Sequence, residues 1–264
     1  MRRFLRPKVQ GGIHVFGCGH SGTSILTHLI GAHSGIYAIP GETGIARRWR
    51  YTRYAAGVKS FEQKVIESGA SIWVEKPPKH IRSIGLILDC APSAKIVLIA
   101  RNPKDAVSSM KRRYGNLEKS LARWKADNRR ALYWSRNPQC KIVLYENFVS
   151  NTRKTLSEVM VFLGFSYEDS QLDFHRQPLS WYSGTVDSIS TGHEHPEPSL
   201  NKFEYGASAT HNAYRDHQIS QPLFNTIGSY RKHHSDNEAA KVWMSCRNLA
   251  LALGYQDDTA LSLK

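Results

Sequence analysis

The sequence predicts an α/β fold of three layers, in which a parallel central sheet carries helices on both faces. Two observations point to this class. Short apolar segments alternate with helical patterns over residues 12–165, and short loops connect them. The segment at residues 94–100 is almost continuously apolar, which is typical of a parallel strand covered on both faces. In such sheets, ligands bind at the carboxyl ends of the strands.

Five segments have the apolar character and the flanking turn signals of strands. They are residues 13–17, 35–39, 71–76, 94–100 and 141–146. Pro77 and Pro78 directly follow the third segment and end it, because proline lacks the N–H that a sheet needs. Helical patterns lie between and after the strands. They cover residues 22–33, 44–56, 58–68, 80–89, 103–113, 117–136 and 153–163.

Helix boundary signals are clearest at two places. Asn102 is a favourable N-cap residue, and Pro103 occupies the first helical position after it. Near the C-terminus, Ser235-Asp236-Asn237-Glu238 forms a capping box that opens a last helix, which Gly254 closes. Residues 216–230 have the pattern of one further helix. The chain therefore ends in helical structure.

We expect a single domain over residues 1–264, because this length suits one large α/β domain. Within it, residues 12–165 would form the ligand-binding core, and residues 166–264 a loop-rich and helical C-terminal part. Residues 175–215 contain prolines and glycines with little periodicity. Long stretches of this kind are often functional lids or disordered segments. We expect the C-terminal part to cover the ligand site.

The chain is strongly basic, with 36 Lys and Arg against 22 Asp and Glu and a net charge of +14. Such a charge fits an anionic ligand, a polyanionic substrate or nucleic acid. No helix-turn-helix, zinc-finger or RNA-binding-sheet motif is present in the sequence, so we do not expect a nucleic-acid partner. The charge alone does not separate the two remaining classes.

The cysteines and the N-terminus bear on the compartment. The four cysteines form no CxxC pair and no zinc pattern, which favours a reducing compartment. The basic N-terminus has no apolar signal core behind it, and no apolar run is long enough to span a membrane. We therefore expect a cytoplasmic protein without stable membrane insertion. The oligomeric state stays open.

The first predicted strand runs into a turn rich in glycine and hydroxyl side chains, at residues 17–24. Gly19 and Gly22 allow a tight turn, and Ser21, Thr23 and Ser24 add hydroxyl donors. Backbone N–H groups and the positive end of the following helix would meet there and bind an anion. The Gly-Lys-Ser/Thr of nucleotide triphosphatases is absent, and the cation before Ser21 is His20. This turn is therefore not built for ATP and magnesium.

Polar side chains also follow the other predicted strands. Gly17, Glu42, Lys76, Arg101 and Tyr145 all stand at or just beyond a strand end. Because the carboxyl ends of parallel strands share one edge of the sheet, we expect these residues to lie close together.

Four of these stretches resemble sulfotransferases that use 3′-phosphoadenosine-5′-phosphosulfate (PAPS), most closely the tyrosylprotein and Golgi-type branch and its bacterial relatives. Gly19-His20-Ser21-Gly22-Thr23-Ser24 resembles their 5′-phosphosulfate loop, except that the family has lysine or arginine in place of His20. Gly41-Glu42-Thr43 resembles the Gly-Glu-Thr that carries their catalytic base. Glu75-Lys76-Pro77-Pro78 and the segment from Arg101 to Ser109 resemble two further family motifs. The resemblance covers residues 12–165 and implies the P-loop NTPase-like sulfotransferase fold.

The resemblance implies a binding role for eleven residues. The 5′-phosphosulfate would contact Gly19, His20, Ser21, Gly22, Thr23 and Ser24. The 3′-phosphate would contact Arg101, Ser109 and Arg113, the last of which lies one helical turn beyond Ser109. Tyr145 matches a family Tyr-Glu-x-Leu motif, and Lys202 matches a late Lys-Trp that closes over the cofactor. The cofactor would be PAPS, its product 3′,5′-ADP (PAP), and no metal is expected.

Sulfuryl transfer needs positioning, charge stabilisation and a base for the acceptor hydroxyl. Lys76 and His20 are the candidates for neutralising the leaving group, His20 fully only when protonated. Glu42 is the first candidate for the base, and His80 is the alternative. Glu75, if buried beside Lys76, would hold that lysine in place.

The acceptor is not identified by the sequence. A carbohydrate, another small molecule with a hydroxyl group (less favourably an amine), a lipid or a peptide tyrosine would each fit. Two other functions stay open at this point. One is a P-loop-type nucleotide or small-molecule kinase, which the missing Gly-Lys-Ser/Thr disfavours. The other is a non-enzymatic module that binds polyanions through its positive charge.

Overall fold

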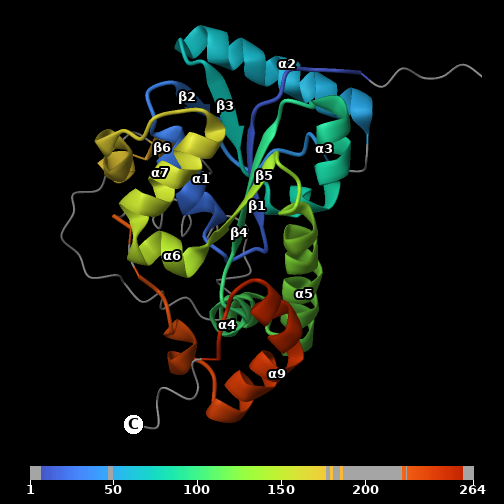
Figure 1. Cartoon of the computed structure of the whole chain (residues 1–264), viewed down its shortest axis with the longest axis vertical. Helices are drawn as coiled ribbons and strands as arrows, with labels where there is room; N and C mark the ends of the chain where they lie inside the picture. Colours follow the sequence, from blue (N-terminus) through green and yellow to red (C-terminus); the bar gives the residue numbers. More distant parts are fainter. Residues whose placement is uncertain are drawn as a thin grey trace, which may run out of the picture.

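The computed structural model describes residues 7–46, 50–176, 179–180, 185–186, 222–223 and 225–257. Its centre is a parallel sheet with the strand order β2-β3-β1-β4-β5 (Figure 1). The strands are β1 (Ile13–Gly17), β2 (Ile36–Ala38), β3 (Ile72–Glu75), β4 (Lys95–Ala100) and β5 (Cys140–Leu144). All four neighbouring pairs are parallel. The predicted fold class is confirmed.

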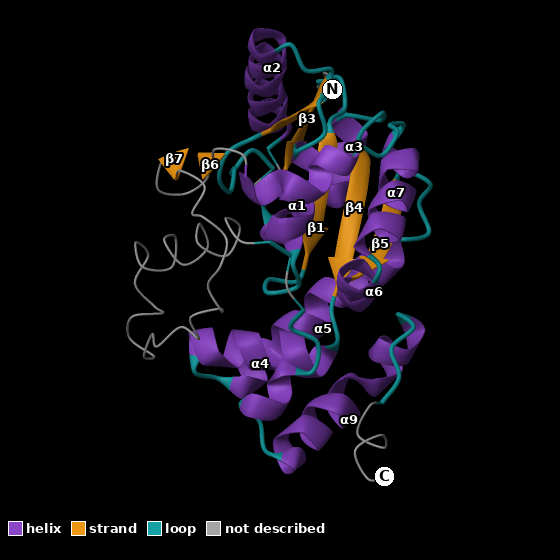
Figure 2. Cartoon of the chain, turned by 90° about the vertical axis from the view of Figure 1, so that its left-hand side faces the viewer, coloured by secondary structure: helices purple, strands orange, loops and turns teal. Residues whose placement is uncertain are grey.

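Helices cover the sheet on both faces, and three of them lie beyond the carboxyl ends of the strands (Figure 2). The elements of one face are α1 (Thr23–Gly31), α6 (Tyr145–Ser150) and α7 (Thr152–Leu163). The other face packs against α2 (Tyr51–Ser68) and α3 (Ile84–Cys90). Beyond the strand ends lie α4 (Pro103–Tyr114), α9 (Asp236–Ala252) and the first part of α5 (Leu117–Trp134), whose Ala131 and Trp134 pack in the cluster under α2 and α3.

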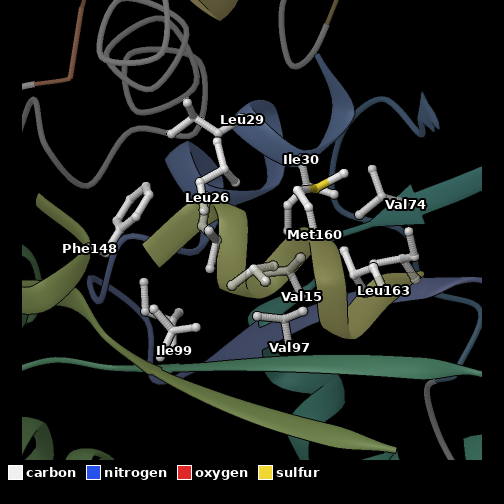
Figure 3. Packing of buried hydrophobic residues seen from close by; sticks show 14 of the residues in the cluster. Val15, Leu26, Leu29, Ile30, Val74, Val97, Ile99, Phe148, Met160 and Leu163 are labelled. Atoms are coloured by element: carbon white, nitrogen blue, oxygen red, sulfur yellow. The ribbon is translucent and has the colours of Figure 1, made fainter. Parts of the chain in front are cut away.

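The strands are buried on both sides because successive residues point to opposite faces. In β1, Val15 belongs to the cluster under α1 and α7, whereas Phe16 belongs to the cluster under α2 and α3. Figure 3 shows the first cluster, in which Leu26 and Ile30 of α1 and Met160 of α7 lie over the strands. This two-sided burial explains the continuous apolar run that the sequence shows in β4.

Several predicted elements are confirmed with their boundary signals. Helix α4 starts at Pro103, and the Asn102 side chain accepts a hydrogen bond from the Lys104 N–H. The side chain of Ser235 accepts one from the Glu238 N–H at the start of α9. Among the described residues, no helix combines the length and the apolar character that a bilayer span requires.

The prediction of two helices, at residues 44–56 and 58–68, is wrong. A single helix, α2, begins at Tyr51, and residues 44–46 are not helical. The reason is the close packing of Ile45 on Gly57 in the middle of the helix. A Cβ at Gly57 would lie only 2.2 Å from Cγ2 of Ile45. The segment after Glu42 therefore crosses α2 instead of extending it.

Three other predictions differ from the structure. The helix at 80–89 is a 3₁₀ helix, η2 (Pro78–Ser83), followed by α3. The fifth strand ends at Leu144, so Tyr145 begins α6. The described residues between 222 and 228 are not helical, because the Asp105 carboxylate accepts hydrogen bonds from the N–H groups of Gly228 and Tyr230. The predicted loop region at 175–215 lies mostly outside the described residues.

Candidate active site

The glycine-rich turn between β1 and α1 has the geometry of an anion site. His20 (φ 67°) and Gly22 (φ 87°) both adopt left-handed backbone conformations, which are unusual for a residue such as histidine. Gly22 is the N-cap of α1, so the first N–H groups of the helix face the turn. The Ser21 hydroxyl is buried and has no hydrogen-bond partner among the described residues. Such an orphaned buried group is expected where a ligand binds.

Lys76 connects this turn to Glu42. Its Nζ atom donates hydrogen bonds to Oγ of Ser24 (2.8 Å) and to Oε1 of Glu42 (3.3 Å). The Lys76 side chain is completely buried, while that of Glu42 keeps 33% of its surface exposed. These residues come from three elements, the end of β3, the first turn of α1 and the loop after β2. The arrangement places a buried cation between the turn and a partly exposed carboxylate.

Glu75 does not pair with Lys76, in contrast to the expectation that it holds this lysine. The two residues are neighbours at the end of β3, so their side chains point to opposite faces of the sheet. Oε1 of Glu75 accepts hydrogen bonds from Nδ1 of His14 (2.8 Å) and Nδ1 of His80 (3.3 Å). The hydroxyl group of Thr43 donates to Oε2. Glu75 therefore ties the loop that carries Glu42 to the interior.

The Glu75 network extends to Tyr54, whose hydroxyl group is 3.0 Å from Nε2 of His14. Burial alone would raise the pKa of Glu75, but the hydrogen bonds from His14 and His80 lower it to about 2. Burial raises the pKa of Tyr54, and the charge of Glu75 raises it further. Tyr54 thus keeps its proton and donates to His14, which in turn donates to an ionised Glu75.

Arg101 follows β4 on the other side of the turn. Its Nη1 donates to the carbonyl oxygen of His20 (3.2 Å), and its Nη2 to the carbonyl and hydroxyl oxygens of Thr226 (both 3.0 Å). The guanidinium lies 4.6 Å from the centre of the Tyr145 ring, and the Tyr145 hydroxyl is 2.7 Å from Oγ1 of Thr226. The Arg101 Nε is buried and has no hydrogen-bond partner among the described residues. The Nε–H donor of a fixed guanidinium thus remains for a ligand.

His20 and Ser109 join the turn to α4. Nδ1 of His20 is 2.8 Å from the hydroxyl oxygen of Ser109. The Arg113 guanidinium, one turn further along the helix, lies 5.5 Å from the centre of the Tyr114 ring. The structure therefore brings the predicted residues at the turn, at Glu42, at Lys76 and at the Arg101 segment into one region. Their roles in binding and catalysis stay predictions.

Two predicted residues lie apart from this region or outside the description. His80 is 2% exposed and is connected to the loop of Glu42 through Glu75 and Thr43. Its Nε2 has no hydrogen-bond partner among the described residues. Lys202 lies outside the described residues. In the described part of the chain, no three His, Cys, Asp or Glu side chains are grouped as metal ligands.

Sequence reasoning did not single out Thr226, Arg123, Tyr54 or His14. A signal existed for His14, because a histidine inside an otherwise apolar strand must find a buried partner. For Thr226 no local signal existed, since its position depends on the docking of residues 226–230 on Asp105. For Arg123 no local signal existed either, because it is one of several cations on the same helix.

Comparisons with known proteins bear on the family and on the fold. A family model described as the sulfotransferase family matches residues 38–169, half of the chain. The sulfotransferase domain of the Synechococcus PCC 7002 olefin synthase has a similar structure, with a TM-score of 0.59 and 15% identity over 97% of this chain and 100% of that one. The sulfotransferase domain from the curacin biosynthetic pathway has a TM-score of 0.57 and 15% identity, over 94% of this chain and 99% of that one.

A mouse sulfotransferase, crystallised with PAP, gives a TM-score of 0.54 and 14% identity over 94% of this chain and 88% of its own. At these identities, the solved structures show a common fold. No curated protein matches the sequence significantly.

Proposed function

Because this chain belongs to the sulfotransferase family, we propose that it transfers a sulfuryl group from PAPS to a hydroxyl group, or less favourably an amine, of an acceptor. The observation that carries the proposal is the row of contacts from Glu42 through Lys76 to Ser24. It puts a carboxylate and a buried cation at the first turn of an anion-binding helix. The mouse sulfotransferase of similar fold binds PAP, which supports the choice of donor.

The residues of the turn suit the phosphates of this donor. The unpartnered Ser21 hydroxyl and the unpartnered Arg101 Nε are both buried, and each can donate one hydrogen bond to an anionic oxygen. Thr23, Ser24 and the N–H groups at the start of α1 add donors at the same turn. PAPS, when bound there, would supply an activated sulfuryl group. We assign the 5′-phosphosulfate to the turn and the 3′-phosphate to Arg101 and Ser109.

Lys76 and Glu42 would carry the chemistry. The Lys76 ammonium is completely buried and already contacts Ser24, so it holds a positive charge where the leaving oxygen becomes negative. The Glu42 carboxylate is partly exposed, so an acceptor hydroxyl can reach it and give up its proton. His20, bonded to Ser109, would donate a hydrogen bond from the other side of the turn.

Exposure favours Glu42 over His80 as the base. The Nδ1 atom of His80 lies against Glu75, an arrangement that leaves Nε2 as a proton acceptor. However, only 2% of His80 is exposed, against 33% of the Glu42 side chain. A base must come within hydrogen-bond reach of its substrate. We therefore place Glu42 in that role and His80 among the residues that fix its loop.

The proposal predicts selective binding of the 3′-phosphorylated nucleotide. Calorimetry should show that 3′,5′-ADP binds at least about tenfold more tightly than 5′-ADP or ATP, since Arg101 would add a charge-assisted hydrogen bond to the 3′-phosphate. Arg101→Ala and Arg101→Lys should abolish this preference. Arg153→Ala, which removes an exposed arginine paired with Asp169, is the matched control and should keep it. Equal binding of the three nucleotides by the unmodified protein would refute the proposed donor.

A further inference from the structure

Three cations surround the ring of Tyr114 at the end of α4. The guanidinium of Arg113, the ammonium of Lys119 and the guanidinium of Arg123 lie 5.5, 5.6 and 5.8 Å from the ring centre. Lys119 and Arg123 are one turn apart on α5, so they share one face of that helix. We call Tyr114, Lys119 and Arg123 the Tyr114 cluster. It lies where α4 and α5 meet beyond the sheet (Figure 2).

Arg123 is fixed in this cluster. Its Nη1 donates a hydrogen bond to the Tyr114 hydroxyl (2.5 Å), and its Nε is 3.5 Å from Oδ2 of the buried Asp127. Its guanidinium also packs directly on the glycine-rich turn at residues 17–24, because a Cβ at Gly19 would lie 2.9 Å from Nη2. About a fifth of the side chain, 19%, stays exposed. An arginine held in this way is ready for a ligand with little loss of side-chain entropy.

The cluster carries more positive than negative charge. Asp127 is the one carboxylate that pairs with Arg123 among the described residues, and it is shared with Arg82. The exposed Lys119 ammonium forms no ion pair in the same part of the chain. Tyr114 accepts a hydrogen bond from Arg123, so its own proton is available to a ligand. A carboxylate or sulfate group would find a fork of N–H donors, an ammonium and a hydroxyl donor here.

The position of the cluster identifies its ligand. The Tyr114 ring is 6.2 Å from the ring of His20, so the cluster flanks the turn on the side of α4 and α5. The donor's 3′-phosphate has its own candidates in Arg101, Ser109 and Arg113, and its phosphosulfate has the turn. On the basis of the proposed function, we infer that the Tyr114 cluster binds an anionic group of the acceptor. The acceptor is then a hydroxyl compound that also carries a carboxylate or a sulfate.

Two pairs of probes, each differing in negative charge, test this inference. One pair is a hyaluronan tetrasaccharide and the neutral, fully N-acetylated chitotetraose, and the other is para-hydroxyphenylacetate and para-hydroxyphenylethanol. Dissociation constants are measured by calorimetry on the full chain saturated with 3′,5′-ADP. The anionic member of at least one pair should bind about tenfold more tightly, the effect of one charge-assisted hydrogen bond.

Lys119→Gln and Arg123→Gln should reduce this preference to less than about threefold and leave the affinity for the neutral member unchanged. Lys119 is exposed, so its variant keeps the fold even if loss of Arg123 disturbs the loop. Arg129→Gln removes an exposed cation of the same helix and should keep the preference.

Three results would overturn the inference. The first is equal affinity for both members of both pairs, and the second is a preference that survives in both variants. The third is a loss of 3′,5′-ADP affinity in both variants without any effect on the probes, which would assign the cluster to the nucleotide. Failure of the unmodified protein to bind 3′,5′-ADP would instead refute the proposed donor, whatever the probes do.

Discussion

At the scale of single residues, Glu75 acts on the site through Thr43. Thr43 follows Glu42 in the chain, and its hydroxyl group donates to a carboxylate that two histidines hold in place. The loop after β2 is thus fixed by a buried anion one residue away from the proposed base. Glu75 is therefore a positioning residue, and its charge state matters for both stability and geometry.

The pKa of Glu75 predicts how stability depends on pH. Its folded-state value of about 2 lies below the ordinary 4.5, so the ionised carboxylate stabilises the fold above pH 4.5. This contribution, roughly 3 kcal/mol, is lost as the pH falls from 4.5 through 2. Urea unfolding should show Glu75→Gln to be less stable than the unmodified protein at pH 7, with a difference that shrinks towards pH 3.

The exposed Glu67 provides the control for this measurement, because Glu67→Gln should leave the free energy of unfolding within about 0.5 kcal/mol. If Glu75→Gln lowers the free energy of unfolding by the same amount at every pH, the shape of the side chain and not its charge accounts for the loss of stability.

The choice between Glu42 and His80 as the base is also decided at this scale. Glu42→Gln should lower kcat by about a hundredfold to ten-thousandfold, the usual contribution of a general base. Affinity for 3′,5′-ADP should change by less than about threefold, since Glu42 in its proposed role would contact the acceptor and not the nucleotide. His80→Gln should cost less than about tenfold in kcat, because it acts through the loop. Stopped-flow or steady-state transfer assays measure kcat for both variants. A larger loss of kcat in His80→Gln than in Glu42→Gln would make His80 the base.

At the scale of elements, the sequence was enough to predict those helices and strands whose boundaries depend on residues close together in the chain. The apolar run of β4, the cap of α4 at Asn102 and the cap of α9 at Ser235 were all predicted and are confirmed. The start of α2 was predicted at residue 44 instead of Tyr51, because the contact of Ile45 with Gly57, which keeps Ile45 outside the helix, is a tertiary one. The docking of Gly228 and Tyr230 on Asp105 likewise ended a predicted helix. Such tertiary contacts have no local signature.

Gly57 tests this explanation of α2. Glycine to alanine inside a helix usually stabilises it by up to about 1 kcal/mol. At Gly57 the new methyl group would meet Ile45 at 2.2 Å, so Gly57→Ala should destabilise the protein by about 1–3 kcal/mol. It should also lower the transfer rate, because Ile45 lies three residues after Glu42. Ser60→Ala, at an exposed position of the same helix, should be neutral or slightly stabilising in thermal unfolding.

At the scale of the whole molecule, the parallel sheet accounts for most of what could be predicted about the site. Residues that end separate strands must meet at one edge, and Lys76, Glu42 and the turn do so. Arg123 and Thr226 could not be predicted in this way. Arg123 reaches the turn from a helix beyond the strand ends, and Thr226 from a segment far along the chain. Only the three-dimensional packing of these parts on the sheet selects them.

The contacts of Thr226 join Arg101, a residue of the proposed nucleotide site, to the C-terminal segment. Arg101 and Tyr145 share its hydroxyl group, and Asp105 holds the next residues. We expect bound 3′,5′-ADP to stabilise this arrangement, because Thr226 of the docked segment holds the Arg101 guanidinium that would contact the nucleotide. Hydrogen exchange of the amides at residues 225–232 should therefore slow by about tenfold when the nucleotide is added. Amides of α2 should not respond.

Thr226→Val keeps the shape of the side chain but removes the shared hydroxyl. It should weaken 3′,5′-ADP binding by about fivefold, the effect of one net hydrogen bond, and should reduce the protection of residues 225–232. Thr226→Ser should keep both at the level of the unmodified protein. Thr155→Val removes a hydroxyl of α7 that donates to the Asn147 carbonyl oxygen, and it should change neither. If nucleotide binding leaves hydrogen exchange in this segment unchanged, Thr226 only holds the Arg101 side chain in place, and nucleotide binding is not coupled to the C-terminal segment.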